Sequence, residues 1–402
     1  MRPPRSIRWA AMTPERPLPS AGDHAWIADL RTPCYVYEPE VAIARYRSLK
    51  ARLGTRLIVS LKANPNQDML ARCAHAYEDG VELASRGELD AVIGRIKTAR
   101  YLNNPSMDEM FMRAGLASRC HFVLDNPDAV ARFVPLAREA AAGGSTPGAV
   151  LLRVNAGALA GVHARAQWHD HFGMTPNEAH DAVRTLAAAG LPVAGLHVFS
   201  GPHSFIRQDP TQPDTLVLPE RLAALARDLA PANGAPLGSL SLGGGFADDH
   251  PGDAAFERYA AALAPLAGRY SLAHESGRAI FADAGVFATR VVAVKTWQDR
   301  TIAVCDGGLS HAFLLAQTES VMRRLAAPSL VRRMPAPPSR GVPTLYVGST
   351  CSRADVIGRD DAGAPPQVGD IAVFERCGAY HRTYSMAHFL SHEAAHVYVR
   401  PA

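Results

Sequence analysis

Lys62 ends an apolar run in the sequence LIVSLKANPN, residues 57–66. The β-branched residues of this run predict a strand that is buried on both faces, and Asn64-Pro65 predicts its end. A lysine at the mouth of a buried strand has two interpretations. Either its ammonium group extends into solvent, or its amine is partly desolvated and forms a Schiff base with a carbonyl compound.

Two glycine-containing segments follow later predicted strands, and both are suited to an anion. The first is Gly243-Gly244-Gly245 and the second is Gly277-Arg278. Glycines leave backbone N–H groups open to a ligand because no side chain is in the way. A glycine triplet alone is also typical of a tight turn, but two such loops, one carrying an arginine, favour a phosphate site.

Glu275 precedes the second glycine segment on the same predicted strand. Strand alternation places Ala273 and Glu275 on one side of the strand, and a carboxylate that faces inward is costly unless a cation pairs with it. That cation is Arg278 or Arg153, or it is the protonated ring nitrogen of a ligand. A phosphate site, a Schiff-base lysine and an acid for a ring nitrogen together describe one cofactor, pyridoxal 5′-phosphate.

The elements that must position these residues alternate between strands and helices. Eight strand-like runs are expected at residues 57–61, 81–84, 99–103, 121–124, 149–155, 193–199, 237–242 and 271–275. Helical spacing separates most of them, as at 127–142, 176–189 and 219–229. This alternation predicts an α/β fold, a (β/α)8 TIM barrel, in which the loops after strands seven and eight commonly hold phosphate. A doubly wound sheet is the alternative fold.

The residue pattern changes after Arg278, from alternating strands and helices to short strand-like runs. Short β-branched runs at 291–295, 301–305, 344–347 and 371–374 are separated by Gly, Pro and Asp, which predicts a C-terminal β domain. The proline-rich stretch 326–342 is expected to be an exposed loop. Near the N-terminus, TPCYVYEP predicts a further strand and residues 41–54 predict a helix.

Composition excludes several classes of protein. With 402 residues, 48% of them hydrophobic, and a net charge of only +4, the chain is expected to be a soluble two-domain protein with no nucleic-acid partner. It has no run of about eighteen apolar residues and no apolar signal core, so we expect no membrane span and a cytoplasmic location. The six cysteines form no CxxC pair and the histidines have no ligand spacing, so no metal site is expected.

Six motifs occur in order between about Thr32 and Ala387: LKANPN, ELASRGELD, LGGGF, ESGRA, the loop at Cys351, and GAY. Together they resemble the fold-type III pyridoxal-phosphate decarboxylases, which act on diaminopimelate, ornithine or arginine and have alanine racemase as a distant relative. The resemblance implies a cofactor-binding barrel over residues 36–281 and a β domain made of 1–35 and 282–402. It also implies a head-to-tail homodimer with shared active sites.

The resemblance implies a role for each motif residue. Lys62 would hold the cofactor covalently, and Glu275 would keep its ring nitrogen protonated. Contacts to the phosphate are implied for Gly243, Gly244, Gly245, Gly277 and Arg278, and Tyr380 would close the site. Glu82, Glu88 and Arg153 match polar positions around the cofactor. Cys351, contributed by the other subunit, would return a proton to Cα after decarboxylation, although a lone cysteine is also typical of a small buried apolar position.

Two segments depart from the family pattern. Where members have HxHxGS, this chain has GLHVFSGPHS, so His197 matches the first histidine, Phe199 takes the place of the second, and Pro202 replaces the serine. Phe199 can stack on the cofactor but cannot hydrogen-bond. In the basic amino acid decarboxylases, an acid that binds the distal ammonium follows the active-site cysteine.

This chain instead continues from Cys351 with Ser352, Arg353, Ala354 and Asp355. We therefore place Ser352, Arg353 and Asp355 at the substrate and expect a distal group that is neutral or acidic, such as a citryl-diamino acid of siderophore biosynthesis. Arg353 pointing to solvent is the other interpretation. The alternatives for function are a basic amino acid decarboxylase, a racemase with a second base, and a non-catalytic cofactor-binding homologue.

Overall fold

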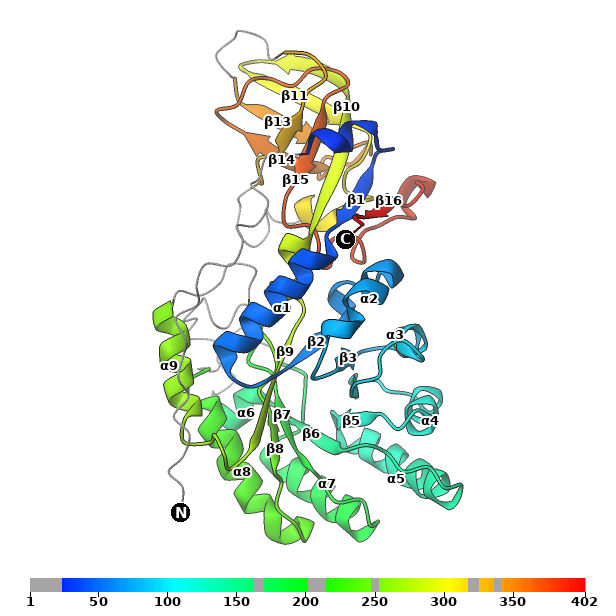
Figure 1. The fold of residues 1–402 in the computed structure, drawn as a ribbon, viewed down its shortest axis with the longest axis vertical. Coiled ribbons are helices and arrows are strands. Elements are labelled where there is room, and N and C mark those ends of the chain that lie inside the picture. Colours follow the sequence, from blue (N-terminus) through cyan, green and yellow to red (C-terminus); the bar gives the residue numbers. More distant parts are fainter. Residues whose placement is uncertain are drawn as a thin grey trace. The chain divides into compact units, whose positions relative to one another are not determined.

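The computed structural model describes residues 24–161, 170–201, 215–246, 253–316, 325–335 and 342–401 (Figure 1). Pro202 of the HxHxGS-like segment lies outside these ranges. Within them the chain forms two compact units. The first spans Ala44–Ile280, and the second combines residues 24–43 with residues 281–401. Each unit is described on its own below.

Eight parallel strands of the first unit close into a barrel. They are β2 (Arg56–Ser60), β3 (Val81–Leu83), β4 (Arg100–Asn103), β5 (His121–Leu124), β6 (Val150–Val154), β7 (Gly195–Val198), β8 (Ser239–Ser241) and β9 (Ser271–Ser276). Each strand lies within two residues of the run that predicted it. Because β9 pairs with β2 and closes the sheet, the prediction of a barrel is confirmed and the doubly wound alternative is wrong.

Helices precede or follow most of the barrel strands and lie outside the barrel (Figure 1). They are α1 (Pro39–Leu53), α2 (Gln67–Cys73), α3 (Arg86–Val92), α4 (Glu109–Ala117), α5 (Pro127–Ala142), α6 (Ala156–Ala160), α7 (Pro176–Ala188), α8 (Leu218–Asn233), α9 (Asp253–Leu263) and α10 (Arg278–Phe281). Their starts are encoded locally. Thr175 and Glu178 form a capping box at α7, and the side chain of Asn126 caps α5 just before Pro127.

The side chains inside the barrel change from apolar to polar along the barrel axis. Ile58, Tyr101 and Ala273 form a buried apolar cluster, and the guanidinium of Arg56 donates to the hydroxyl of Tyr101 at 3.0 Å on the amino-terminal side of that cluster. Toward the carboxyl ends of the strands, the buried inward positions become polar. This is the end at which (β/α)8 barrels carry their functional groups.

The second unit is built on an eight-stranded sheet. Its strands are β1 (Cys34–Tyr37), β10 (Gly285–Trp297), β11 (Arg300–Cys305), β12 (Ser329–Val331), β13 (Thr344–Val347), β14 (Val356–Asp360), β15 (Ile371–Phe374) and β16 (His396–Val399). The order is β12-β15-β10-β11-β13-β14, and β1 pairs antiparallel with β10 and parallel with β16.

Three of these strands depart from the sequence prediction. Strand β12 lies inside the stretch 326–342, which was expected to be a loop, and it forms because it pairs with β15. Strands β14 and β16 were not predicted. The sequence of β14, VIGRD, carries a glycine and two charges, and the residues of β16 are all half-buried, so neither has the period of a core strand.

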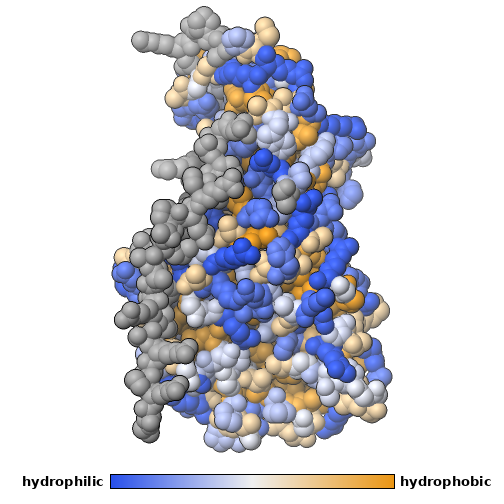
Figure 2. All heavy atoms as spheres, in the orientation of Figure 1, coloured by the Kyte–Doolittle hydropathy of each residue, from blue (hydrophilic) through white to orange (hydrophobic). Residues whose placement is uncertain are grey.

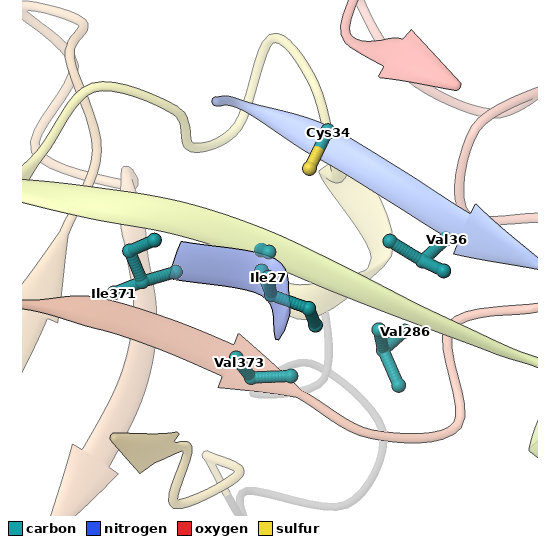
Figure 3. Packing of buried hydrophobic residues seen from close by; sticks show 7 residues of the cluster. Ile27, Cys34, Val36, Val286, Ile371 and Val373 are labelled. Atoms are coloured by element: carbon teal, nitrogen blue, oxygen red, sulfur yellow. The ribbon is translucent and has the colours of Figure 1, made fainter. Parts of the chain in front are cut away.

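A core cluster holds the centre of this sheet together (Figure 3). Ile27 from the short helix η1 (Ala25–Asp29) packs against strand residues that include Val36 of β1, Val286 of β10 and Val373 of β15. Every residue of the cluster is at most 8% exposed. Burial of several aliphatic side chains, each worth about 1.5–3 kcal/mol, therefore ties the N-terminal strand to the C-terminal part of the chain.

None of the helices among the described residues is long and apolar enough to cross a membrane. Figure 2 shows hydrophilic residues spread over the visible face, with apolar residues between them.

Candidate active site

Lys62 lies at the carboxyl end of β2, on a short 3-10 turn, η2 (Leu61–Ala63), that follows the strand directly. Its Nζ is 2.8 Å from both carboxylate oxygens of Glu82. Glu82 is fully buried, whereas the side chain of Lys62 is 43% exposed. Since Glu82 is the cross-strand neighbour of Ser60, the ion pair holds the amine at the mouth of the barrel while leaving it accessible.

Glu275 faces the barrel interior from β9 and is 7% exposed. Its Oε1 is 3.2 Å from Nε2 of His197 and 3.5 Å from Oγ of Ser241. Burial by itself raises the pKa of this carboxyl, but the charges of His197, Lys62 and Arg153 outweigh burial and hold the pKa below its usual range. Glu275 is therefore a buried carboxylate, and neither Arg278 nor Arg153 forms the salt bridge that the sequence had left open.

His197 is buried at 1% exposure on β7. Its contact with Glu275 lacks hydrogen-bond alignment, so neither ring nitrogen has a hydrogen-bond partner in the described part of the chain. Oδ1 of Asn103, at the end of β4, is in the same situation. A buried polar group without a partner costs about 1–3 kcal/mol, and such groups need an explanation. Here they indicate a polar ligand at the barrel mouth.

Arg153 is more constrained than the sequence suggested. Its guanidinium is 3.4 Å from Oδ2 of Asp125 and stacks 4.3 Å above the ring of Phe172. Asp125 also accepts the N–H of Gly173 at 3.1 Å. The arginine is thus already paired, which fixes its direction inside the barrel.

The sequence analysis missed three residues of the ring of polar side chains that lies at the carboxyl ends of the barrel strands. Asn103, Asp125 and Ser241 each end an apolar strand or follow it directly, as in HFVLD, where Asp125 is the last residue. A single polar residue at the end of a strand was the only available signal.

The glycine loops have a packing requirement of their own. A Cβ at Gly243, which has a φ of 63°, would lie 2.4 Å from the carbonyl oxygen of Val198 and would crowd Phe199. A Cβ at Gly277 would lie 2.6 Å from Cβ of Ala63, next to Lys62. These glycines therefore bring the loops after β8 and β9 close to β7 and to the lysine turn. Phosphate contacts from them, from Gly244 and Gly245, and from the half-buried Arg278 stay a prediction.

Glu88 and Phe199 lie near this ring of residues. The carboxylate of Glu88 accepts the N–H of Ala84 at 2.6 Å, and the N–H of Glu88 donates to the side chain of Ser85, the N-cap of α3. Partial burial raises the pKa of Glu88. Glu88 therefore stabilises the start of α3, and a contact with the cofactor stays a prediction. Phe199 is half-buried directly after β7.

The remaining predicted site residues belong to the second unit. Cys351 is exposed in the loop between β13 and β14, and the other five cysteines are buried. Arg353 is also exposed, which agrees with either interpretation of it, and Ser352 is half-buried. Asp355 is buried, and its carboxylate accepts the N–H of Leu309 at 2.7 Å. Its geometry is that of a residue that holds the loop, and contact with substrate stays a prediction.

Tyr380 has an unusual backbone conformation, with a φ of 66°. Positive φ is uncommon outside glycine and concentrates at functional sites. The ring of Tyr380 packs edge-on against Tyr384 at 6.1 Å between centroids. Two residues earlier, a Cβ at Gly378 would lie 1.9 Å from the carbonyl oxygen of Phe281, so the first residue of the GAY motif must be glycine.

The family model described as "Pyridoxal-dependent decarboxylase, C-terminal sheet domain" matches residues 34–378. The chain belongs to the pyridoxal-dependent decarboxylases. It is accordingly a carboxy-lyase, and its cofactor is pyridoxal 5′-phosphate. Among the described residues, no group of three or more His, Cys, Asp or Glu could hold a metal ion.

Several relatives of this decarboxylase are named diaminopimelate decarboxylase. The one from Deinococcus radiodurans is 28% identical over 359 residues, which covers 87% of this chain and 85% of the relative. A second relative, from Niallia circulans, is named L-glutamyl-[BtrI acyl-carrier protein] decarboxylase and is 24% identical over 394 residues, which covers 90% of this chain and 87% of the relative.

Solved structures share the fold of this decarboxylase. The lysine/ornithine decarboxylase from Vibrio vulnificus, in complex with cadaverine, superimposes with a TM-score of 0.75 at 20% identity and covers 94% of this chain and 97% of that one. The arginine decarboxylase from Paramecium bursaria Chlorella virus has the same TM-score at 17% identity, covering 91% of this chain and 95% of that one.

Proposed function

We propose that this chain decarboxylates an amino acid, or an amino-acid conjugate, whose distal group is neutral or acidic, with Lys62 as the residue that holds the cofactor. The orphaned nitrogens of His197, the buried Glu275 carboxylate and the accessible Lys62 amine fit pyridoxal phosphate, because they offer a donor, an anion and a nucleophile within one barrel mouth. When bound, the cofactor withdraws electrons from Cα and stabilises the charge left by departing CO2.

Each residue of the first unit has a separate task in this proposal. Glu82 accepts hydrogen bonds from the Lys62 ammonium and so fixes the position of the amine. Glu275, held as an anion, binds a protonated ring nitrogen and keeps the proton there. Arg153 and His197 line the same ring, and Phe199 offers an apolar face for stacking. The proposed phosphate ligands are Gly243, Gly244, Gly245, Gly277 and Arg278.

Residues of the second unit complete the proposed site in a head-to-tail homodimer. Cys351 of one subunit would give its thiol proton to Cα in the site of the other subunit, and the thiol is suited to this because it is exposed at the tip of a loop. Tyr380 would cover the cofactor. We place this reaction in the cytoplasm. Cys351→Ala is expected to slow or misdirect the return of the proton while leaving the cofactor bound.

One observation carries the substrate class: none of the three residues that directly follow Cys351 carries a carboxylate. Ser352 and Arg353 follow the cysteine, and the only acid of the segment, Asp355, is buried at 2% exposure and bonded to its own chain. A terminal ammonium would therefore lose about one charge-assisted contact, worth about 1.5–3 kcal/mol. Arg353 offers the opposite charge and suits a carboxylate.

The Niallia circulans relative supports this choice, because its name describes a glutamyl group joined to a carrier, and such a group has no distal ammonium. A citryl-diamino acid of siderophore biosynthesis has the same character. The test compares CO2 release from citryl-diaminopropionate, lysine, ornithine and meso-diaminopimelate. The proposal predicts fastest release from the conjugate, and preference for a free diamine would contradict it.

Diaminopimelate is the second candidate, because the Deinococcus radiodurans and Pseudomonas aeruginosa relatives carry that name. Its distal end bears both an ammonium and a carboxylate, so Arg353 could meet the carboxylate. Comparing CO2 release from the conjugate and from meso-diaminopimelate separates the two candidates, and Arg353→Ala tests the contact that both would make. We expect it to raise KM for the conjugate, with a control, Arg359→Ala, that removes another exposed arginine of the same unit.

A further inference from the structure

Asp355 closes the loop that carries Cys351, and it does so through three hydrogen bonds. Its Oδ2 accepts the backbone N–H of Thr350 at 3.0 Å and the hydroxyl of Thr350 at 2.7 Å. Its Oδ1 accepts the backbone N–H of Leu309 at 2.7 Å. The carboxylate therefore ties two segments together that are about forty residues apart in the sequence, and Cys351 is the next residue after Thr350.

Two glycines leave the space that this carboxylate occupies. A Cβ at Gly308 or at Gly348 would lie 2.3 Å from Oδ1 of Asp355. The backbone of Gly348 also donates to the carbonyl oxygen of Asp355 at 3.0 Å. Any other residue at either glycine would push the carboxylate out of place, so the position of Asp355 is fixed by sterics as well as by hydrogen bonds.

Asp355 takes part in no ion pair among the described residues, although it is only 2% exposed. Burying a carboxylate that is compensated by hydrogen bonds alone contributes little net stability compared with an apolar side chain. What it supplies is a fixed geometry, since each oxygen accepts from a different segment. Cys351 itself is exposed.

We infer that Asp355 is a positioning residue for Cys351: its buried carboxylate anchors the loop from Thr350 to Asp355 to the backbone at Leu309 and so sets the direction of the thiol. The inference rests on the proposed role of Cys351 as proton donor to Cα. This role is separate from a contact with substrate, which stays a prediction for Asp355.

Asp355→Asn tests the anchor because it keeps the shape of the side chain. An amide has one oxygen, so its NH2 group must face either the N–H of Leu309 or the donors of Thr350, and one side of the anchor is lost. In the cofactor-free protein, amide hydrogen exchange should become faster in peptides that contain residues 307–311 and 348–356. The matched control is Asp360→Asn in the same unit, because the one oxygen of the amide can still accept the N–H of Gly363.

The decisive readout is where the proton goes after CO2 is lost. If the thiol is displaced, it would return the proton to Cα less often, and an aldehyde with pyridoxamine phosphate would appear, with uptake of one water, in place of the amine product. We expect Asp355→Asn to raise the ratio of pyridoxamine phosphate to amine product by about tenfold or more, because small misplacements of a reacting group are costly. The substrate is the one of the panel above that the wild type decarboxylates fastest.

A double-variant comparison separates positioning from a general structural effect. In a Cys351→Ala background, Asp355→Asn should change the product ratio by less than about twofold, because effects of coupled residues are not additive. Equal effects with and without Cys351, or a normal ratio in Asp355→Asn despite faster exchange, would overturn the inference. If Asp355→Asn does not fold, Thr350→Val removes one donor to Oδ2, and Thr350→Ser should restore the wild-type ratio.

The proposed function fails in a different way. If Cys351→Ala alone gives a normal product ratio, Cys351 is not the proton donor, and the positioning role falls with it. Unchanged exchange in Asp355→Asn, with an abnormal ratio in Cys351→Ala, would instead overturn the anchor alone.

Discussion

Two buried carboxylates, one in each unit, differ in what surrounds them. Asp355 accepts three hydrogen bonds from its own chain, at 2.7–3.0 Å. Glu275 has only a misaligned histidine at 3.2 Å and a hydroxyl at 3.5 Å among the described residues. Both were assigned to the site from the sequence. The difference teaches that burial alone does not distinguish an acid of the site from an acid of the scaffold, whereas its remaining capacity to accept hydrogen bonds does.

The largest loss of activity is expected when Glu275, the acid assigned to the site, is replaced. Glu275→Gln should lower kcat for decarboxylation by about a hundredfold to a thousandfold, because an amide cannot balance a protonated ring nitrogen in a buried site. The absorbance of the cofactor joined to Lys62 should persist. Ser241→Ala is the control, since its hydroxyl lies at the limit of hydrogen bonding. A fully active Glu275→Gln variant would remove Glu275 from the mechanism.

For the free energy of unfolding, we expect the larger loss at Asp355 and the smaller loss at Glu275. In the cofactor-free protein, Asp355→Asn should lower the free energy of unfolding by about 1–3 kcal/mol, because a donor loses its acceptor in a buried place. Glu275→Gln should cost less than this, because Glu275 accepts no well-aligned hydrogen bond at close distance from the described residues, even though the charges of His197, Lys62 and Arg153 favour its ionised form. Urea denaturation of both variants measures the contrast. Equal losses in the two variants would mean that both acids serve the scaffold.

Two buried histidines of the barrel differ in the same way, in whether the chain itself supplies their hydrogen-bond partners. His274, just before Glu275, is bonded at both ring nitrogens, to Thr55 at 2.7 Å and to Tyr259 at 2.8 Å. His197 has no such partner in the described residues. Burial lowers the pKa of His274 to about 3 from an ordinary value of 6.5, so this imidazole is neutral and structural.

His274 is expected to make the free energy of unfolding depend on pH. Below about pH 6.5 the unfolded chain binds a proton on this residue and the folded chain does not, so stability falls as pH is lowered toward about 3. The slope is at most about 1.4 kcal/mol per pH unit. His274→Asn should make the fall less steep between pH 6.5 and 4.5 in urea titrations, whereas His75→Asn, at an exposed position, should not. An unchanged slope in His274→Asn would contradict the assignment.

The smallest effect is expected at Phe199, which occupies the place of a family histidine. Phe199→His should change the affinity for pyridoxal phosphate by less than about tenfold, because either ring can stack on the cofactor. Equilibrium titration of the cofactor-free protein measures this, with Phe199→Ala as the comparison that removes the stacking face. A larger gain in Phe199→His would mean that a hydrogen bond, not stacking, is what this position lacks.

The sequence predicted the barrel well because its strands are apolar, β-branched and bounded by Gly, Pro or Asn. It could not predict β12 or β16, which are short, half-buried and held by pairing with β15 and β1. That pairing depends on contacts distant in sequence, which local pattern does not report.

The sequence singled out individual motif residues but not the pairs that they form. Lys62 and Glu275 could be singled out because each is a charge next to an apolar strand. The contacts of Lys62 with Glu82 and of Glu275 with His197 depend on strand register, which brings residues from different strands to one level of the barrel. Asp125, the partner of Arg153, could not be found without that register.

Chemical trapping of the cofactor tests the central claim most directly. The sequence contains four lysines, Lys50, Lys62, Lys97 and Lys295. Protein loaded with pyridoxal phosphate is reduced with borohydride, digested and mapped by mass spectrometry. The account predicts the pyridoxyl group on Lys62 alone, and none in Lys62→Ala. A label on Lys50, Lys97 or Lys295 instead, or no label after loading, would contradict it.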